Sequence, residues 1–321
     1  MSAKPDVLLL ATGGTVAKNA EGEYLPGEQL VEEIPEISQV ADVTVREVAS
    51  TGSSDMTFEN WLHFADEIER AAAREKPPDG IVLTHGSNTV EETAFFLHLA
   101  IQTEIPVVLT AAQRHHGFTG NDGDRNLLNA IEVAGHPDSG GRGVLIVINE
   151  EIHSARDVTK HASGRPDGWT SRNHGVLGLI DKRGIVEFVR QPEKPHTAQT
   201  EFDVSELTAD EFPTVEVIFA AVELDGTLMD AAVEHGADGL VMAGFATGTP
   251  NRTGQTSAVE RAREQGIPVV SAYRGQEGMT TPTETLIWGN THLPQKARIL
   301  LMLALMETDD HAEIERMFET Y

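Results

Sequence analysis

Short apolar runs alternate with longer amphipathic stretches along this chain, and no other feature restricts its fold as strongly. Each run is four to six residues long, which suits strands that are buried on both faces of a sheet. The stretches between them, such as residues 61–73 and 91–101, have the apolar spacing of helices. Strand–helix alternation of this kind is typical of an α/β fold. The predicted strands are residues 7–11, 80–84, 106–110, 144–148, 215–220, 240–243 and 268–271.

Residues 191–213 separate two such regions. This segment contains three prolines and little helical periodicity, so we expect it to be an interdomain linker. A length of 321 residues suits two domains, and a hydrophobic content of 40% is enough for sizeable cores. The expected domains are an N-terminal α/β domain, residues 1–190, and a C-terminal α/β domain, residues 214–321, whose last long helix begins near Pro294.

Acidic side chains outnumber basic ones by 51 to 24, which gives the chain a formal net charge of −27. Such a charge repels nucleic-acid phosphates and anionic membrane surfaces, so we expect neither as a partner. The acidic residues are spread along most of the length, and arginine outnumbers lysine. This pattern fits either an ordinary solvated surface or adaptation to high salt, where dense carboxylates keep a protein hydrated. We favour salt adaptation.

The chain has no cysteine, which excludes disulfides, thiolate metal sites and cysteine nucleophiles. Its first residues lack the apolar segment of a signal peptide, and no stretch approaches the roughly 18 apolar residues of a membrane span. These features predict a soluble, cytoplasmic protein.

Two polar, glycine-containing loops follow predicted strands. Residues 12–15 (TGGT) end the first strand, and residues 85–89 (HGSNT) end the second. Ligands of open α/β sheets bind beyond the carboxyl ends of strands, and glycine lets a backbone approach a ligand closely. Both loops also fit a purely structural role. The first would be a tight turn, and the second would start a helix through a capping box of Thr89 with Glu92, or of Asn88 with Glu91.

A lysine in a lysine-poor chain, Lys160, follows the fourth predicted strand. A lysine beside buried hydroxyls loses its proton more easily and can serve as a base, although an isolated lysine is usually a surface residue. The histidines His115, His116 and His161 have no recognised metal-ligand spacing, so no metal is expected. The G-x-S-x-G, Walker A and G-x-G-x-x-G motifs are absent.

Five segments carry a resemblance to a known family. They are residues 10–17 (LATGGTVA), 52–56 (GSSDM), 84–94 (THGSNTVEETA), 153–160 (HSARDVTK) and 294–298 (PQKAR). Together, and in this order, they resemble the bacterial-type L-asparaginase family nearly from end to end. The acidic composition further favours a haloarchaeal-like member.

The resemblance implies two α/β domains, a larger N-terminal domain with a mixed sheet and a smaller C-terminal domain with a parallel, flavodoxin-like sheet. It also implies an active site near their junction and a homo-oligomer, a dimer or a tetramer. The implied reaction needs no cofactor. L-asparagine, a small amide, is hydrolysed to L-aspartate and ammonia through a threonine-linked acyl-enzyme.

The resemblance also implies roles for single residues. Thr15 matches the nucleophile, Tyr24 the tyrosine that helps to activate it, Ser87 the second catalytic hydroxyl and Lys160 the lysine partner of that hydroxyl. The implied substrate-binding residues are Gly14, Ser53, Ser54, Gly86 and Asn88. These roles agree with elementary chemistry, because a hydroxyl needs a neighbouring base to become a nucleophile and a tetrahedral intermediate needs N–H donors.

Two residues depart from the family, which usually has threonine and aspartate where this chain has Ser87 and Asn88. Serine keeps the hydroxyl. A neutral Asn88 loses a charge-assisted hydrogen bond to the substrate's α-ammonium, which weakens binding by about 1.5–3 kcal/mol. Either another carboxylate binds the ammonium, with Glu277 and Glu284 in the plausible region, or the natural substrate is a small carboxamide without an ammonium.

Residues 113–120 and 246–248 also differ from the usual family sequence, which fits either altered specificity or loop drift. Two rival functions share the fold. One is the subunit of a tRNA-dependent amidotransferase, for which an acidic surface is unsuited. The other is a degenerate family member that binds a ligand without turning it over. Hydrolysis of L-asparagine is the preferred hypothesis.

Overall fold

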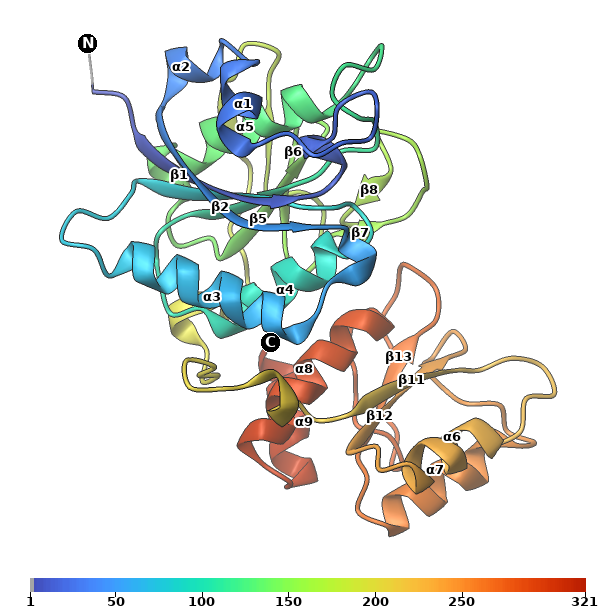
Figure 1. Cartoon of the computed structure of the whole chain (residues 1–321). Coiled ribbons are helices and arrows are strands. Elements are labelled where there is room, and N and C mark those ends of the chain that lie inside the picture. Colours follow the sequence, from blue (N-terminus) through green and yellow to red (C-terminus); the bar gives the residue numbers. More distant parts are fainter. Residues whose placement is uncertain (1–2) are drawn as a thin grey trace. The chain divides into compact units, whose positions relative to one another are not determined.

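A mixed sheet of eight strands is the centre of the N-terminal unit in the computed structural model, which describes residues 3–321 (Figure 1). Its strands are β1 Asp6–Gly13, β2 Asp42–Thr51, β3 Gly80–Thr84, β4 Val107–Thr110, β5 Val144–Ile148, β6 Glu151–Ser154, β9 Gly178–Ile180 and β10 Val186–Phe188. The strand order is β10-β9-β6-β5-β4-β3-β1-β2. The strands β5, β4, β3, β1 and β2 run parallel to one another. The remaining pairs, β5 with β6, β6 with β9 and β9 with β10, are antiparallel.

Burial on both faces explains why the central strands have continuous apolar sequences. Every residue of β3, β4 and β5 is buried, so their sequences show no alternation between apolar and polar residues. β2 lies at an edge and alternates between half-buried and exposed residues along much of its length. Because β1, β2 and β3 are parallel neighbours, their carboxyl ends at Gly13, Thr51 and Thr84 lie at the same edge of the sheet.

Helices cover both faces of this sheet (Figure 1). On one face lie α3 Phe58–Ala72 and α4 Val90–Ala100, and on the other lie α1 Gly27–Glu32, α2 Ile37–Val40 and α5 Gly123–Ala134. α3 is amphipathic and starts at a capping box of Thr57 and Asn60. α4 is buried around almost its whole circumference, which makes it a core helix.

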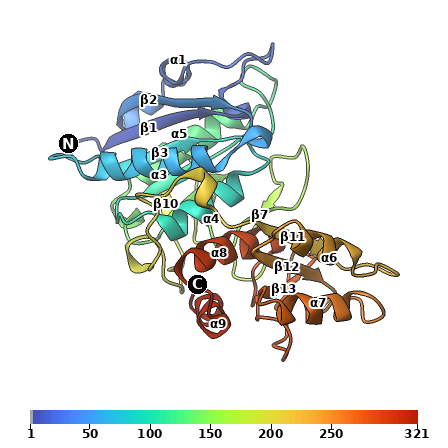
Figure 2. The same ribbon diagram turned by 60° about the horizontal axis from the view of Figure 1, so that its bottom comes forward.

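The C-terminal unit contains a separate parallel sheet of three strands in the order β11-β12-β13. Its elements are β11 Val215–Phe219, α6 Thr227–Glu234, β12 Gly239–Gly244, α7 Gln255–Glu264, β13 Val269–Tyr273, α8 Pro294–Glu307 and α9 His311–Thr320. Figure 2 shows the three strands side by side between α8 and the pair formed by α6 and α7. Leu240, Met242 and Val259 belong to the core of this unit.

Smaller elements complete the chain. A two-stranded hairpin pairs β7 Thr159–Lys160 with β8 Trp169–Thr170. The 3₁₀ turns are η1 Thr15–Ala17, η2 Ser53–Asp55, η3 Pro137–Ser139, η4 Thr197–Gln199 and η5 Ala209–Glu211.

The predicted fold class is confirmed: the larger N-terminal unit has a mixed sheet and the smaller C-terminal unit a parallel one. All seven predicted strands are present, with ends that differ by at most two residues. The elements that were not predicted from the sequence include β2, the short strands β6 to β10 and the helices α1, α2, α5 and α9. β2 in particular is an edge strand, and its charged and partly exposed residues interrupt the apolar run on which the prediction relied.

The segment between β10 and β11 has two 3₁₀ turns and otherwise irregular backbone. The chain divides into its two compact units between Leu207 and Thr208. The first part of the segment packs onto the N-terminal unit, since Phe202 is buried and the Thr200 hydroxyl donates a 2.6 Å hydrogen bond to the carbonyl of Leu99.

None of the helices formed by residues 3–321 combines the length and the apolar character that crossing a membrane requires.

Candidate active site

Three loops meet at the edge of the sheet where β1, β2 and β3 end. The loop after β1 contains Gly13 and Gly14, the turn after β2 contains Ser53, and the loop after β3 contains His85 and Gly86. The first and third loops are tied together near their bases. The Thr12 backbone N–H donates a 3.1 Å hydrogen bond to the Thr84 hydroxyl, and the Thr12 hydroxyl donates one to the Thr84 carbonyl.

Glycine is required where these loops touch. At Gly14, with φ +84°, a Cβ atom would lie only 2.4 Å from the carbonyl carbon and oxygen of His85. At Gly86, a Cβ atom would lie 2.5 Å from the hydroxyl oxygen of Ser53. A side chain at either position would therefore push the loops apart, and the two glycines set the spacing of the candidate site.

Thr15 begins the 3₁₀ turn that follows Gly14. Its side chain is half-buried, and within residues 3–321 its hydroxyl has no hydrogen-bond partner. Tyr24 is also half-buried, and its ring packs beside Gly13 with its hydroxyl directed to the surroundings of Gly52. The ammonium of Lys18 lies 4.7 Å from the centroid of the Tyr24 ring. A free threonine hydroxyl and a tyrosine thus share the same loop region.

Ser53, Ser54 and Asn88 form a connected polar group. The Asn88 backbone N–H donates a 3.2 Å hydrogen bond to the Ser53 hydroxyl, and the Asn88 side-chain amide donates one of 3.0 Å to the Ser54 hydroxyl. Ser53 is buried, whereas Ser54 and Asn88 are exposed. Because the amide nitrogen of Asn88 binds Ser54, its side-chain oxygen remains an acceptor for a ligand.

The predicted capping box at the start of α4 is wrong. Thr89 is the N-cap residue of α4, but its side chain makes no capping hydrogen bond. Its hydroxyl instead donates a 2.8 Å hydrogen bond to the carbonyl of Ser53. The alternative cap by Asn88 does not form either, since that side chain reaches Ser54. These side chains therefore make hydrogen bonds to another loop instead of capping the helix as a local rule would predict.

Lys160 and Ser87 form the one direct contact between two predicted catalytic residues that the described chain shows. The ammonium of Lys160 donates a 2.8 Å hydrogen bond to the Ser87 hydroxyl. Lys160 is half-buried in the β7–β8 hairpin, and its ammonium lies 5.9 Å from the centroid of the Trp169 ring. Burial lowers the pKa of Lys160, and the negative charge of Glu91 partly opposes this effect. A lysine of this kind can exchange a proton with a hydroxyl.

The His85 side chain is packed between the loop after β3 and the helix α3. It is fully buried, its Nδ1 lies 2.9 Å from the Gly86 carbonyl oxygen, and its ring stands edge-on to Phe64. Burial lowers the pKa of His85 to about 4, although the hydrogen bond to Gly86 acts in the opposite direction. The ring is therefore neutral at pH 7, and it fills space under the loop without adding charge.

Comparisons with known proteins identify the family to which this chain belongs. A family model described as "Asparaginase, N-terminal" matches residues 6–194, and one described as "Glutaminase/Asparaginase C-terminal domain" matches residues 214–318. The chain belongs to the asparaginase family. The matches to its relatives extend over 99% of this chain, so the family assignment does not rest on a single motif.

Three asparaginase relatives illustrate the similarity. L-asparaginase 2 of Bacillus subtilis is 37% identical, and the match covers 99% of this chain and 87% of that protein. The probable periplasmic L-asparaginase of Haemophilus influenzae is also 37% identical, with 99% and 93% covered. The crystal structure of the probable cytoplasmic L-asparaginase of Campylobacter jejuni superposes with a TM-score of 0.93 at 35% identity, covering 99% of this chain and all of that one, 100%.

Two residues beside the asparaginase motif positions were not predicted from the sequence as part of the site. His85 was given no role and Glu91 only an alternative capping role, although both lie within the segment that carried the resemblance. The available signals were a histidine directly after a buried strand and a glutamate in the first turn of an almost wholly apolar helix. Glu91 is only 6% exposed, which is unusual for a glutamate.

Several predicted positions belong to other segments of the chain. Glu277 and Glu284 are exposed residues of the C-terminal unit, as are Ala246 and Thr247. In the loop of residues 113–120, His116 is held by two carboxylates. Its Nε2 lies 2.6 Å from Glu33 and its Nδ1 lies 2.7 Å from Asp124. This histidine therefore fixes its own loop.

One group of side chains within residues 3–321 has a spacing that would suit a metal ion: His63, Asp66 and Glu67 on α3. Both carboxylates already have cationic partners. Arg46 lies 2.6 Å from Glu67, and Arg70 lies 2.9 Å from Asp66. A metal ion would have to displace these arginines, so the group is better explained as an ion-pair network.

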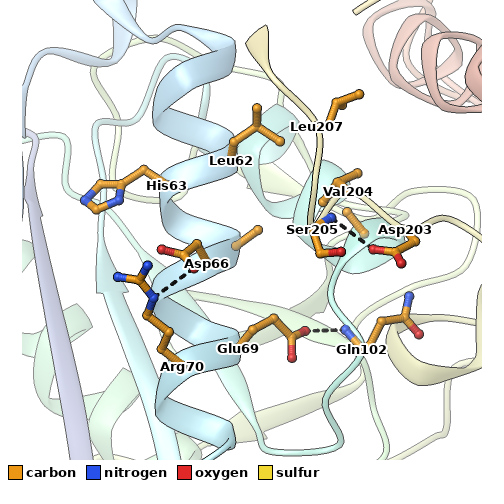
Figure 3. Close-up of a pocket in the computed structure, with 12 residues that line it drawn as sticks. Leu62, His63, Asp66, Glu69, Arg70, Gln102, Asp203, Val204, Ser205 and Leu207 are labelled. Carbon is orange, nitrogen blue, oxygen red and sulfur yellow. Dashed lines mark hydrogen bonds and ion pairs between the residues drawn. The ribbon is translucent and has the colours of Figure 1, made fainter. Parts of the chain in front are cut away.

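A cavity of about 590 Å³ lies between α3 and residues 203–207 (Figure 3). Its polar groups bind one another: the Gln102 N–H donates to Glu69, and the Ser205 N–H donates to Asp203. None of the predicted site residues lines this cavity. The cavity is therefore separate from the cluster of predicted site residues.

We predict that His85 and His116 titrate on opposite sides of the ordinary histidine pKa. His85 should titrate at about 4. Desolvation alone would lower the pKa of His116, but hydrogen bonds to and charges of Asp124 and Glu33 outweigh it, so the pKa is raised. Histidine-selective NMR across the pH range measures both, with His85→Gln and His116→Gln used to assign the signals.

The His85 pKa also has a consequence for stability. Between pH 6.5 and 4 the unfolded chain binds a proton that folded His85 does not, so the free energy of unfolding should fall as the pH is lowered through this window. A His85 signal that titrates near pH 6.5 would contradict both expectations.

Proposed function

We propose that this chain hydrolyses L-asparagine to L-aspartate and ammonia through an acyl-enzyme on Thr15. The observation that carries the proposal is the 2.8 Å hydrogen bond from Lys160 to Ser87, on the loop that packs against Gly14. A lysine–hydroxyl pair beside a free threonine hydroxyl supplies a nucleophile and a proton carrier in one site. Membership of the asparaginase family, established over both units, supports a carboxamide as the substrate.

In the proposed reaction, the Thr15 hydroxyl oxygen attacks the carboxamide carbon of the substrate. Tyr24 helps to remove the hydroxyl proton, and backbone N–H groups of Gly14 and Gly86 stabilise the negative oxygen of the tetrahedral intermediate. The C–N bond then breaks, and Lys160 delivers a proton through Ser87 to the departing ammonia. Water subsequently attacks the ester and releases aspartate.

Substrate recognition is proposed for Ser53, Ser54 and Asn88. Hydroxyl and backbone N–H groups suit the α-carboxylate of the substrate, and the side-chain oxygen of Asn88 can accept a hydrogen bond from the α-ammonium. Asn88 has no charge, however, and this observation favours a second candidate function. In that alternative the enzyme prefers a small carboxamide without an α-ammonium, with the same nucleophile and the same proton carriers.

We predict that Thr15→Ala lowers the rate of ammonia release from L-asparagine by about a thousandfold or more, because the attacking oxygen is lost. The measurement is ammonia release by the purified protein, with circular dichroism to verify folding. Thr44→Ala is a matched control, because Thr44 is an exposed threonine on β2. Full turnover by Thr15→Ala would place the nucleophile elsewhere, and ligand binding without turnover by the parent protein would identify a degenerate binding protein.

We predict that Asn88→Asp lowers the KM for L-asparagine about tenfold to a hundredfold, because a carboxylate strengthens the bond to the α-ammonium. The KM for succinamate, which lacks the α-amino group, should not fall. Ser54→Ala is the control, since it removes the hydrogen-bond partner of Asn88 without adding charge. If the parent protein hydrolyses succinamate far better than L-asparagine, the alternative substrate class is the correct one. An unchanged KM for L-asparagine in Asn88→Asp would exclude Asn88 from ammonium recognition.

We also propose that the protein is adapted to high salt, as in a haloarchaeal-like member of the family. A net charge of −27 creates repulsion among surface carboxylates, which dissolved cations screen. The melting temperature and the activity should therefore rise as KCl increases from millimolar to molar concentrations. A protein that is fully stable and active in dilute buffer, with no gain from salt, would contradict this proposal.

Two further properties of the protein are proposed, its assembly and its location. Copies of the chain assemble into a dimer or tetramer, and sedimentation showing a monomer at assay concentrations would overturn this. The protein is cytoplasmic, which is supported by its likeness to the Campylobacter jejuni protein. Recovery of the natural protein in the exported fraction of its cells would overturn the second statement.

A further inference from the structure

Glu91 is a buried carboxylate whose place in the fold needs an explanation. It lies in the first turn of α4 and is only 6% exposed. Nearly all other residues of this helix are also buried. Glutamate is rarely buried to this degree unless it is paired. One oxygen, Oε1, accepts a 3.4 Å hydrogen bond from the backbone N–H of Lys160. The other, Oε2, is buried with no hydrogen-bond partner within residues 3–321.

The surroundings of Lys160 show what this carboxylate faces. The loop before α4 contributes the hydroxyl of Ser87 and β8 contributes the ring of Trp169, neither of which is charged. Asn88 is neutral, and its side chain is turned to Ser54. His161 is next in the chain, and its Nδ1 is buried without a hydrogen-bond partner among the described residues. Among the described residues, Glu91 is thus the negative charge that opposes the effect of burial on the pKa of Lys160.

We propose that Glu91 is a positioning residue that holds the β7–β8 hairpin against α4 and keeps a proton on Lys160 for delivery through Ser87 to the departing ammonia. This inference rests on the proposed function, and it adds a residue that the family resemblance did not supply. Its parts come from distant segments, since Lys160 and Glu91 are 69 residues apart in sequence. The backbone hydrogen bond sets the position of the lysine, and the carboxylate charge sets its protonation.

The physical reason is a balance between burial and charge. Burial alone disfavours an ammonium at Lys160, and a neutral amine could not donate a proton to a leaving group. A carboxylate that is itself shielded from water interacts more strongly with the ammonium than a surface carboxylate does. Removing the charge of Glu91 should therefore make Lys160 lose its proton at a lower pH.

The first test is Glu91→Gln, which keeps an oxygen for the Lys160 N–H and removes the charge. The titration of the Lys160 side chain should move to lower pH, because the carboxylate charge that favours the ammonium is lost. It can be followed by NMR of lysine-labelled protein without any substrate, with Lys160→Arg used to assign the signal. The high-pH limb of the kcat profile should move in the same direction, while KM for L-asparagine stays nearly constant because Glu91 does not contact the substrate.

Two further variants separate charge from structure. Glu91→Asp keeps the charge on a shorter side chain and should restore most of the Lys160 titration, even if kcat falls. Glu92→Gln changes the neighbouring half-buried carboxylate and should leave the titration in place. An unshifted Lys160 titration in Glu91→Gln, or a shift of equal size in Glu91→Asp, would overturn the inference. Because the titration needs no turnover, a protein that hydrolyses no carboxamide would refute the proposed function and still leave the Glu91–Lys160 coupling measurable.

Discussion

The close packing of three backbone segments is the constraint on which the rest of the site depends. Gly14 lies against the backbone of His85 and Gly86, and Gly86 lies against Ser53, at separations that leave no space for a side chain. Parallel pairing of β1, β2 and β3 brings these segments to one edge of the sheet. Because the two glycines have no side chains, the segments can then approach one another closely. A threonine hydroxyl, a serine cluster and the start of α4 therefore lie in one small region.

Electrostatics inside this region follows different rules from those at the surface. Most of the chain's 51 acidic residues are solvated, so their charges are screened and individually weak. Glu91 is buried and Lys160 is half-buried, and the hydrogen bond from Lys160 to Ser87 places the ammonium charge next to the proposed chemistry. His85 is buried as well, but burial holds it neutral, with a pKa of about 4. Its contribution is therefore shape, whereas the contribution proposed for Lys160 is a proton.

Local sequence rules succeeded where one energetic term dominates. The buried strands β3, β4 and β5 are apolar on both faces, so a run of Val, Leu and Ile predicted each of them. The rules failed where terms compete. Thr89 is a good capping residue by sequence, yet its hydroxyl binds the carbonyl of Ser53 instead of capping α4. Glu91 and Glu92 are adjacent identical residues, and only the packing of α4 decides that the first is buried.

The sequence by itself determined the buried strands and their alternation with helices, the glycine and hydroxyl residues of the loops, the acidic composition and the resemblance to the asparaginase family. These properties depend on residue type and short-range spacing, which a sequence contains directly. Only the tertiary structure decided which polar groups meet and how deeply they are buried. Ser87 and Lys160 are 73 residues apart in the chain, and their 2.8 Å contact exists because β7 is folded against the start of α4. Hydrogen bonds and desolvation depend on distances of that kind, and no local pattern specifies them.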